Sequence, residues 1–272
     1  MDIQKLDIIP NSLLNIKSSP KELFFLGNME LLSKPKIAIV GTRRPSQYSK
    51  NFIYSLANKL SKNGFVVVSG GAIGTDILAH QSSFPDTISV MANSLDIIYP
   101  KTNSEMIRAM SKDALLISES RENVPAHPKK FIHRNRLIVG LADILIVIEA
   151  DKKSGSSQTM RIAMEMGKKI YVLPHRIGES LETNSYLENG QAQGIYDIDN
   201  FIDNLKSLYG LDCKDDQGKM IQPEKKEFDS VLDFCKTSPT YEEAFAKFGD
   251  TLFEYELNGD IEVVNGFVIL KN

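Results

Sequence analysis

Short apolar runs recur along the first two thirds of the chain, and they constrain the fold more than any other feature of the sequence. They are rich in β-branched residues and contain few polar side chains. Near-continuous hydrophobicity over so few residues indicates strands buried on both faces, as in a parallel sheet covered by helices. We therefore predict six core strands, at Ile37–Val40, Phe65–Ser69, Thr87–Met91, Ala114–Ser118, Ile144–Glu149 and Lys169–Leu173.

Segments with helical periodicity separate these runs. In Gln47–Asn63, apolar residues fall at Phe52, Leu56 and Leu60, and the pattern stops at Gly64. Thr159–Gly167 has a similar pattern. Alternation of strands and helices predicts an α/β fold, with an extended Rossmann-like parallel sheet that carries helices on both faces.

The domain organisation follows from one polar stretch near the C-terminus. Residues 211–223, LDCKDDQGKMIQP, contain a glycine and a proline and predict a linker. The linker would join a Rossmann-like domain at residues 35–210 to a small domain at residues 224–272. The N-terminal segment, residues 1–34, indicates little beyond a short helix around Pro20–Gly27.

The C-terminal domain combines short helical patterns with a hairpin signal. Tyr241–Phe248 and Thr251–Asn258 have helical patterns, and Asn265-Gly266 lies between two apolar runs, which is the strongest short-range sign of a hairpin. This order suggests a winged-helix-like domain. Its candidate recognition helix, Thr251–Asn258, contains Glu254 and Glu256 and no cation, so it would repel phosphates. A protein-partner or packing role fits this domain better, and an acidic face with no role is an equal alternative.

Charge is distributed unevenly along the chain. The formal net charge is only −3, yet residues 34–180 hold 21 Lys and Arg against 12 Asp and Glu, a net charge of +9. Such concentration suits a polyanionic ligand held by the Rossmann-like domain, although lysines scattered over a solvated surface would give the same sum.

Other features of the composition exclude several classes of protein. The two cysteines, Cys213 and Cys235, have no metal-type spacing with the four histidines, so we expect neither a disulfide scaffold nor a bound metal. The N-terminus lacks a basic stretch followed by an apolar one, and no apolar run approaches the roughly 20 residues that a membrane span requires. We expect a cytoplasmic protein with no membrane partner.

Small and polar residues follow three of the predicted strands, at the edge where an open parallel sheet binds ligands. Small residues let backbone N–H groups approach an oxyanion, and a helix N-terminus adds its partial positive charge. Each loop could therefore hold a phosphate, although a single glycine-rich loop is as often only a tight turn. The candidate binding residues in these loops are Gly41, Thr42, Arg43, Arg44, Ser69, Gly70, Gly71, Ala72, Ser154, Gly155 and Ser156.

A fourth candidate site is the basic stretch Pro128–Arg136, PKKFIHRNR. Lysine and arginine form charge-assisted hydrogen bonds with phosphates, and an aromatic face stacks on an unpaired base for about 1–3 kcal/mol. Two alternatives remain open, since Phe131 could instead anchor the core and Arg136 could form an internal salt bridge. The candidate binding residues here are Lys129, Lys130, Phe131, Arg134, Asn135 and Arg136.

Together the loops resemble the DprA/Smf family of DNA-processing proteins, which aid natural transformation. The resemblance covers about Pro35 to Ile198. It rests on five motifs in order: Gly41-Thr42-Arg43; Ser69-Gly70-Gly71-Ala72-Ile73-Gly74-Thr75-Asp76; Ser94-Leu95-Asp96 with Tyr99-Pro100; Phe131-x-x-Arg134-Asn135-Arg136; and Glu149-Ala150 followed by Ser154-Gly155-Ser156. Three positions depart from the usual family pattern: Ile132 replaces a proline, His175 a common glycine and Ser157 a leucine.

The resemblance implies a function and partners. It implies an extended Rossmann domain that forms a homodimer, binds and protects single-stranded DNA in a basic pocket, and helps load RecA onto that DNA during recombination. Carried over to this sequence, Arg43, the Ser69–Ala72 loop, Phe131 and Arg134 should lie in or beside the pocket. No cofactor is implied.

The sequence gives little support for an enzyme. The loop after the first strand lacks the Gly-x-Gly-x-x-Gly of dinucleotide-binding proteins, and no Walker-type Gly-Lys-Ser/Thr is present. The carboxylates Asp76, Asp96 and Glu149 are scattered rather than paired, and Asp76 is better placed to order its loop. The alternative we keep is a nucleoside-monophosphate glycosidase of the lysine-decarboxylase-like type, although its Pro-Gly-Gly-x-Gly-Thr-x-x-Glu motif is missing.

Overall fold

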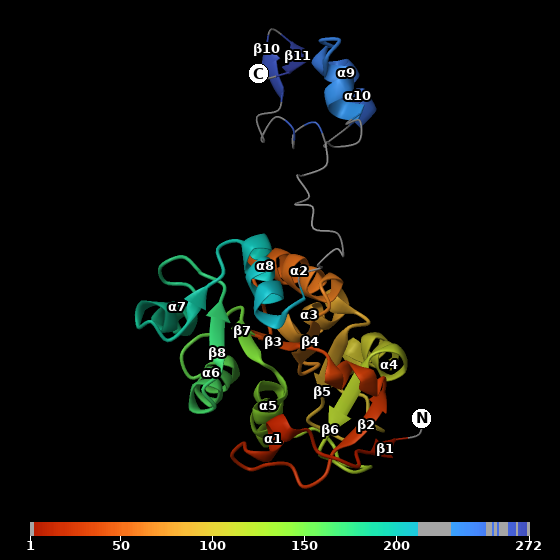
Figure 1. The fold of residues 1–272 in the computed structure, drawn as a ribbon, viewed down its shortest axis with the longest axis vertical. Helices are drawn as coiled ribbons and strands as arrows, with labels where there is room; N and C mark the ends of the chain where they lie inside the picture. The colour runs from red at the N-terminus through yellow and green to blue at the C-terminus, as the bar shows by residue number, and fades with distance from the viewer. Residues whose placement is uncertain are drawn as a thin grey trace. The chain divides into compact units, whose positions relative to one another are not determined.

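A nine-stranded sheet forms the centre of the larger of two structural units, Met1–Cys213 (Figure 1). The protein is represented by a computed structural model that describes residues 3–211, 230–248, 252, 255, 261–264 and 266–270. The strands lie in the order β1-β2-β6-β5-β4-β3-β7-β8-β9. Their bounds are β1 Gln4–Lys5, β2 Phe24–Gly27, β3 Lys36–Val40, β4 Val66–Ser69, β5 Thr87–Val90, β6 Leu115–Ser118, β7 Ile144–Val147, β8 Lys169–Val172 and β9 Gln193–Gly194.

The six predicted core strands are β3 to β8, and each observed strand ends within two residues of its predicted bounds. Within β3, β4, β7 and β8, alternate side chains enter two different cores, because successive residues of a strand point to opposite faces. In β3, for example, Ile37 and Ile39 belong to one buried cluster, while Ala38 and Val40 belong to the other. Burial on both faces explains why the sequence shows continuous apolar runs rather than alternation.

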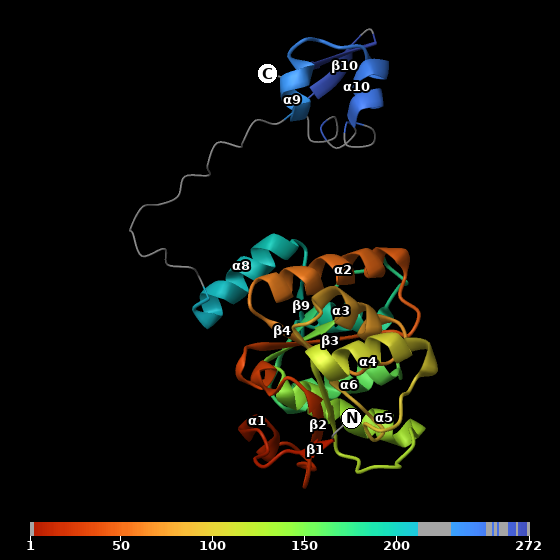
Figure 2. The same ribbon diagram turned by 90° about the vertical axis from the view of Figure 1, so that its right-hand side faces the viewer.

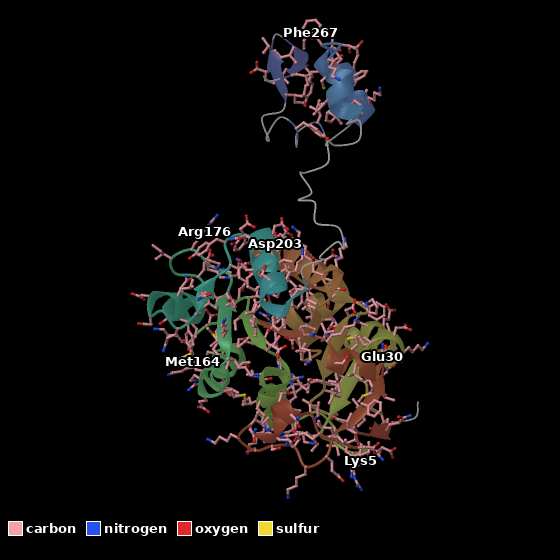
Figure 3. All side chains as sticks on the ribbon, viewed as in Figure 1. Lys5, Glu30, Met164, Arg176, Asp203 and Phe267 are labelled. Carbon is pink, nitrogen blue, oxygen red and sulfur yellow. The ribbon has the colours of Figure 1, made fainter. Side chains whose placement is uncertain are left out.

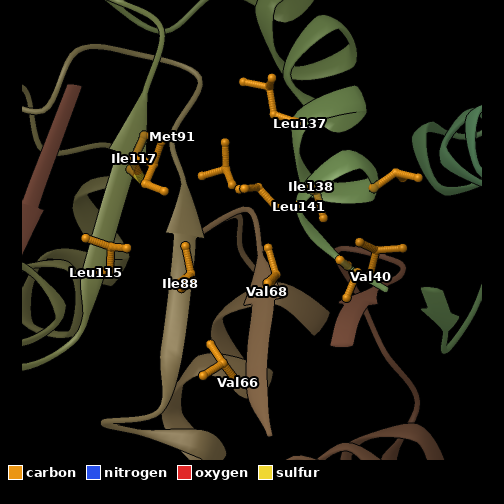
Figure 4. Close-up of a cluster of buried hydrophobic side chains, with 14 of the residues drawn as sticks. Val40, Val66, Val68, Ile88, Met91, Leu115, Ile117, Leu137, Ile138 and Leu141 are labelled. Carbon is orange, nitrogen blue, oxygen red and sulfur yellow. The ribbon is translucent and has the colours of Figure 1, made fainter. Parts of the chain in front are cut away.

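Helices cover both faces of the sheet, which confirms the predicted α/β class (Figure 2). One face packs against α2, α3 and α8, and the other against α5 and α6. We call the core beneath α5 and α6 the second core. In Figure 4, Leu137, Ile138 and Leu141 of α5 lie over Val40, Val68 and Ile88 of its strands. The helices of this unit are α1 Asn11–Leu14, α2 Gln47–Lys62, α3 Thr75–Ser83, α4 Ser104–Asp113, α5 Pro128–Leu141, α6 Gly155–Glu165, α7 Leu181–Glu188 and α8 Ile198–Tyr209, with 3-10 turns at Met29–Ser33 and Lys101–Asn103.

The N-terminal segment differs from the prediction. The helix expected around Pro20–Gly27 is wrong, because Phe24–Gly27 forms strand β2 and pairs antiparallel with β6. Leu23, Phe24 and Leu26 are buried in the second core. The segment therefore extends the sheet and is part of the domain, and the sheet is mostly rather than wholly parallel.

The second unit, Lys214–Asn272, has its own small core. Its described elements are the helices α9 Ser230–Cys235 and α10 Tyr241–Phe248 and the antiparallel hairpin β10 Ile261–Val264 and β11 Phe267–Leu270. Phe267, labelled in Figure 3, is 47% exposed on this hairpin. The predicted linker beyond Leu211 and, apart from Leu252 and Tyr255, the predicted recognition helix lie outside the described residues. The winged-helix assignment stays a prediction.

Candidate functional site

The direction in which the chain crosses the sheet reverses at β3. From β3 the chain adds β4, β5 and β6 on one side, then returns to add β7, β8 and β9 on the other. Strands β4 and β7 both pair parallel with β3, so their carboxyl ends meet at one edge. Ligands of open α/β sheets bind in the crevice at such a reversal.

A cavity of about 620 Å³ lies at this edge. Its walls come from the loops after β3, β4 and β7, from the cavity-facing side of α5 and from the start of α6. The candidate residues that line it are Gly41, Thr42, Arg43, Ala72, Phe131, Arg134, Asn135, Ser154, Gly155 and Ser156. Residues from all four candidate segments of the sequence thus line one cavity.

An aromatic and cationic cluster occupies one wall of the cavity. The guanidinium carbon of Arg43 lies 5.8 Å from the ring centroid of Phe131, within the range of a cation–π interaction. Tyr99 lies on the same wall, with its ring centroid 5.8 Å from that of Phe131. Arg43 and Tyr99 are exposed and Phe131 is only partly buried, so all three side chains can meet a ligand.

Arg134 is built into the cavity floor and is only 5% exposed. Its guanidinium donates hydrogen bonds to the carbonyl oxygens of Gly70, at 2.6 Å, and Val90. Burial lowers the pKa of Arg134 to about 10, although Asp76 opposes the shift and Arg43 reinforces it. Arg134 therefore remains a cation at neutral pH, in contact with the loop that follows β4.

The Ser69–Ala72 loop is held by side chains rather than left open for a ligand. The Ala72 N–H donates to Asp76 at 3.3 Å, which supports the interpretation that Asp76 orders this loop. Burial raises the pKa of Asp76, while Arg134 and the hydrogen bonds of the loop lower it. The loop that was predicted to bind phosphate through its amides thus mainly supports Arg134.

Gly70 is required by this arrangement, because a Cβ atom there would overlap the Arg134 guanidinium. Gly74 has a φ of +86°, and a Cβ atom on it would lie 2.5 Å from the backbone of Arg43. These two glycines therefore allow the close approach of both arginine-bearing segments. By contrast, a Cβ atom on Gly155 would meet nothing within 4 Å, so Gly155 faces open space.

The start of α6 contributes backbone donors to the cavity. Ser154 caps the helix by accepting a hydrogen bond from the Ser157 N–H at 3.0 Å. Gly155 and Ser156 follow in the first turn, where N–H groups have no acceptor within their own helix. Because the positive end of the helix dipole also lies here, the first turn of α6 can bind an anion.

Three carboxylates also line the cavity: Asp76, Glu149 and Asp151. Asp76 is buried beneath Arg134, and Glu149 accepts hydrogen bonds from the Ser46 N–H at 2.9 Å and its hydroxyl at 2.8 Å. Burial raises the pKa of Glu149, but bonds from Ser49 and Ser46 outweigh this effect, and the pKa is lowered. Asp76 and Glu149 thus accept hydrogen bonds from the protein itself, whereas Asp151 is exposed.

The remaining candidate residues lie outside the cavity lining. Arg44 and Lys129 are exposed and Lys130 is partly buried, next in sequence to residues that line it. Ser69, Gly70 and Gly71 are buried behind its wall, where the Ser69 hydroxyl donates to the Ile39 carbonyl at 2.6 Å.

The structure does not bring Arg136 to the cavity. It forms a two-pronged salt bridge with Glu119, at 2.6 and 2.8 Å, and donates to the Ser18 carbonyl at 2.9 Å. The side chain is buried, so its charge is balanced within the fold. This geometry agrees with the salt-bridge alternative raised from the sequence.

Tyr99 is a cavity residue that sequence reasoning left out of the site. The Tyr99-Pro100 pair belongs to one of the family motifs, but no predicted strand ends directly before it. An exposed aromatic next to a proline in a loop was the available signal. Among the described residues, no group of three or more metal-ligating side chains occurs, and none of the described helices is long and apolar enough to span a membrane.

Comparison with known proteins agrees with this geometry. The family model for DNA recombination-mediator protein A matches residues 4–206. DNA processing protein DprA of Bacillus subtilis is 38% identical over 61% of this chain and 57% of its own length, and DprA of Streptococcus pneumoniae is 36% identical over 64% and 63%. The chain therefore matches less than two thirds of the length of these curated relatives.

Two solved structures share the fold of the larger unit. DNA processing protein A from Helicobacter pylori, for which a single-stranded DNA binding mode is described, superposes with a TM-score of 0.75 and 43% identity over 76% of this chain and 96% of that chain. DprA from Streptococcus pneumoniae gives a TM-score of 0.69 and 31% identity over 74% of both chains. Since the family model covers most of the chain and the fold agrees, this protein belongs to the DNA recombination-mediator protein A family, also called DprA or Smf.

Proposed function

We propose that this protein binds single-stranded DNA in the cavity at the sheet edge and acts by binding rather than by covalent chemistry. The observation that carries the proposal is the wall formed by Arg43, Phe131 and Tyr99, which offers a cation and two aromatic rings to one ligand. Such a wall suits an unpaired base, because stacking requires an exposed base face that a duplex does not offer.

Phosphate groups have separate partners around the same hollow. Arg43 and Arg44 are exposed at one side, and Lys129 and Lys130 stand in the first turn of α5 at another. The free N–H groups of Gly155 and Ser156 can receive a phosphate oxygen between them. We assign the DNA contacts to the predicted residues that line the cavity or stand beside it. Ser69, Gly70 and Gly71 instead support the cavity wall from behind, and Arg136 pairs with Glu119 within the fold.

The relatives support the same ligand and suggest a wider role. The Helicobacter pylori protein binds single-stranded DNA, and the family description is that of a recombination mediator. We propose that this protein protects incoming single strands in the cytoplasm and helps load RecA onto them. A homodimer would hold one strand at two cavities and raise the overall affinity through avidity.

The glycosidase alternative is not favoured. Its defining motif is missing from the sequence, and the family to which the chain belongs is one of DNA-binding recombination mediators. We expect no release of free base from nucleoside monophosphates. Enzyme-dependent release that is lost in an Arg43→Ala variant would contradict the binding-only proposal.

The first prediction tests the binding site itself. Fluorescence anisotropy with labelled single-stranded and double-stranded oligonucleotides, at two salt concentrations, should show tighter binding of the single strand and weaker binding at high salt. Arg43→Ala should weaken binding and reduce the salt slope by about 0.7 per lost phosphate contact, since fewer counterions are released.

Two further variants complete this experiment. Phe131→Ala should lower affinity by the equivalent of about 1–3 kcal/mol with little change in the salt slope, because stacking releases few counterions. Lys62→Ala, at an exposed lysine on α2 away from the cavity, serves as the control and should change neither quantity. Equal affinity for single and double strands, or no effect of Arg43→Ala, would refute the proposed site.

A further inference from the structure

A second hollow, of about 770 Å³, lies on the other side of α5 from the cavity wall. It is enclosed by the N-terminal segment, α5 and the end of α6. Ile132 lines both hollows and is 46% exposed. The two hollows are therefore neighbours, separated by an apolar side chain that stands where the family usually has a proline.

The second hollow contains cations that the fold does not neutralise. Lys17 and Lys168 line it, and neither takes part in an ion pair among the described residues. Lys168 donates a hydrogen bond to the Ala142 carbonyl at 2.7 Å. This acceptor carries no net charge, so it does not neutralise the ammonium group. Arg136 also lines the hollow, but Glu119 balances its charge, and Glu165 is the one carboxylate in the lining.

The position of Lys17 is fixed by contacts on both sides of it in the sequence. The preceding residues Leu13 and Ile16 pack against Gly140 of α5, where a Cβ atom would lie 2.6 Å from Leu13. The following residue, Ser18, accepts a hydrogen bond from buried Arg136. The contacts on either side of Lys17 thus fix its backbone where the side chain lines the hollow.

A line of basic residues joins the two hollows along α5. Lys129 and Lys130 stand in its first turn beside the cavity, and His133 lies one turn later in the lining of the second hollow. An extended single strand that leaves the first cavity needs cations at successive phosphates and apolar contacts for its bases. The α5 surface supplies both, with cations at Lys129 and Lys130 and an apolar side chain at Ile132.

We propose that the second hollow is an extension of the DNA site, in which Lys17 and Lys168 hold phosphates of the strand after it has crossed α5 at Ile132. This inference rests on the proposed function, since it assigns the path of the same ligand. The site would act only on strands long enough to reach beyond the first cavity. It therefore predicts a dependence on oligonucleotide length.

The test compares a short oligothymidine of about 6 nucleotides with a long one of about 20 nucleotides. The double variant Lys17→Ala/Lys168→Gln should bind the short strand like the unmodified protein and the long strand several-fold more weakly. Its salt slope on the long strand should fall by about 1.4, from two lost phosphate contacts. The control is Lys62→Ala/Lys112→Gln, which removes two exposed lysines from α2 and α4.

Because Lys168 also bonds to the Ala142 carbonyl, the single variant Lys17→Glu keeps the test independent of folding. It should weaken binding of the long strand alone. Unchanged binding of both strands by Lys17→Glu, or an equal loss for both lengths, would overturn the inference while leaving the first cavity in place. If the unmodified protein bound neither strand, the proposed function itself would fail.

Discussion

At the scale of single residues, the site depends on a glycine that makes room for a buried cation. Arg134 is held by the carbonyls of Gly70 and Val90, and its neighbour Asp76 holds the Ala72 N–H. The glycine-rich loop, Arg134 and Asp76 therefore form one hydrogen-bonded cluster. The loop's composition serves this packing more than it serves direct contact with a ligand.

Gly70→Ala should disturb this hydrogen-bonded cluster. The new Cβ atom would overlap the Arg134 guanidinium, which is buried and hydrogen-bonded and so cannot move aside freely. We expect the free energy of unfolding to fall by about 1–3 kcal/mol, as for other overpacked sites, and DNA binding to weaken. Urea denaturation and anisotropy would measure the two effects.

The matched control is Gly155→Ala, at a glycine that lines the cavity itself. Its Cβ atom would enter open space, so the free energy of unfolding should change by no more than about 0.5 kcal/mol. Equal stability of the two variants would show that Arg134 yields to the added methyl group at no cost.

The sequence could not distinguish the roles of Arg134 and Arg136. Both are basic residues of the same motif, two positions apart, yet one meets the cavity and the other pairs with Glu119. The difference arises from contacts with residues distant in the chain, namely Gly70 for Arg134 and Ser18 for Arg136. A local pattern carries no information on such partners.

At the scale of elements, α3 joins the sheet through a buried polar chain. The Thr87 hydroxyl donates to the Val67 carbonyl at 2.9 Å, so its oxygen accepts from His80 Nδ1 at 2.7 Å. His80 Nδ1 must then carry the proton, and Nε2 is buried with no partner in the described structure. A second proton on His80 would create a buried cation near Arg134.

Stability should therefore decline in acid. Burial, with a smaller contribution from Arg134, lowers the pKa of His80 from 6.5 to about 3. The pKa of His80 is lower in the native protein than in the unfolded chain, so the unfolded chain takes up the proton first as the pH falls. The contribution of His80 to the free energy of unfolding is therefore complete above pH 6.5 and is lost below it. The loss from this residue should approach about 1.4 kcal/mol per pH unit below that value.

His80→Gln is the variant that isolates this effect, because glutamine can still donate to Thr87 but does not titrate. Urea midpoints at neutral pH and at about pH 5 should differ less in the variant than in the unmodified protein. The same pH dependence in both would show that other groups cause the acid sensitivity.

The elements themselves were largely predictable from sequence, with one instructive exception. Strands β3 to β8 are continuous apolar runs because both of their faces are buried, and that pattern is local. Strand β2 was missed because its antiparallel partner β6 lies some 90 positions later in the chain, so no local signal marks the pairing. Its short pattern, FFLG, fits a helix end as well as a strand.

At the scale of the whole molecule, the two structural units carry net charges of opposite sign. Residues 1–213 carry a net charge of +3 and form one unit, whereas residues 214–272 carry −6 and form another. The described residues of the second unit have their own apolar core, and the cavity is lined entirely by the first. The DNA site should therefore not need the acidic unit.

A chain that ends after Cys213 tests this separation. We expect it to unfold at the same urea concentration as the larger unit of the full chain, because the two cores share no residue. Its affinity for single-stranded DNA should equal that of the full chain at about 0.3 M salt, where charges are screened within several ångströms. At about 0.05 M salt it should bind more tightly, since removal of six net negative charges reduces the repulsion of the polyanion. Anisotropy titrations of both chains would measure this, and weaker binding by the shortened chain at both salt concentrations would show instead that the acidic unit contributes contacts of its own.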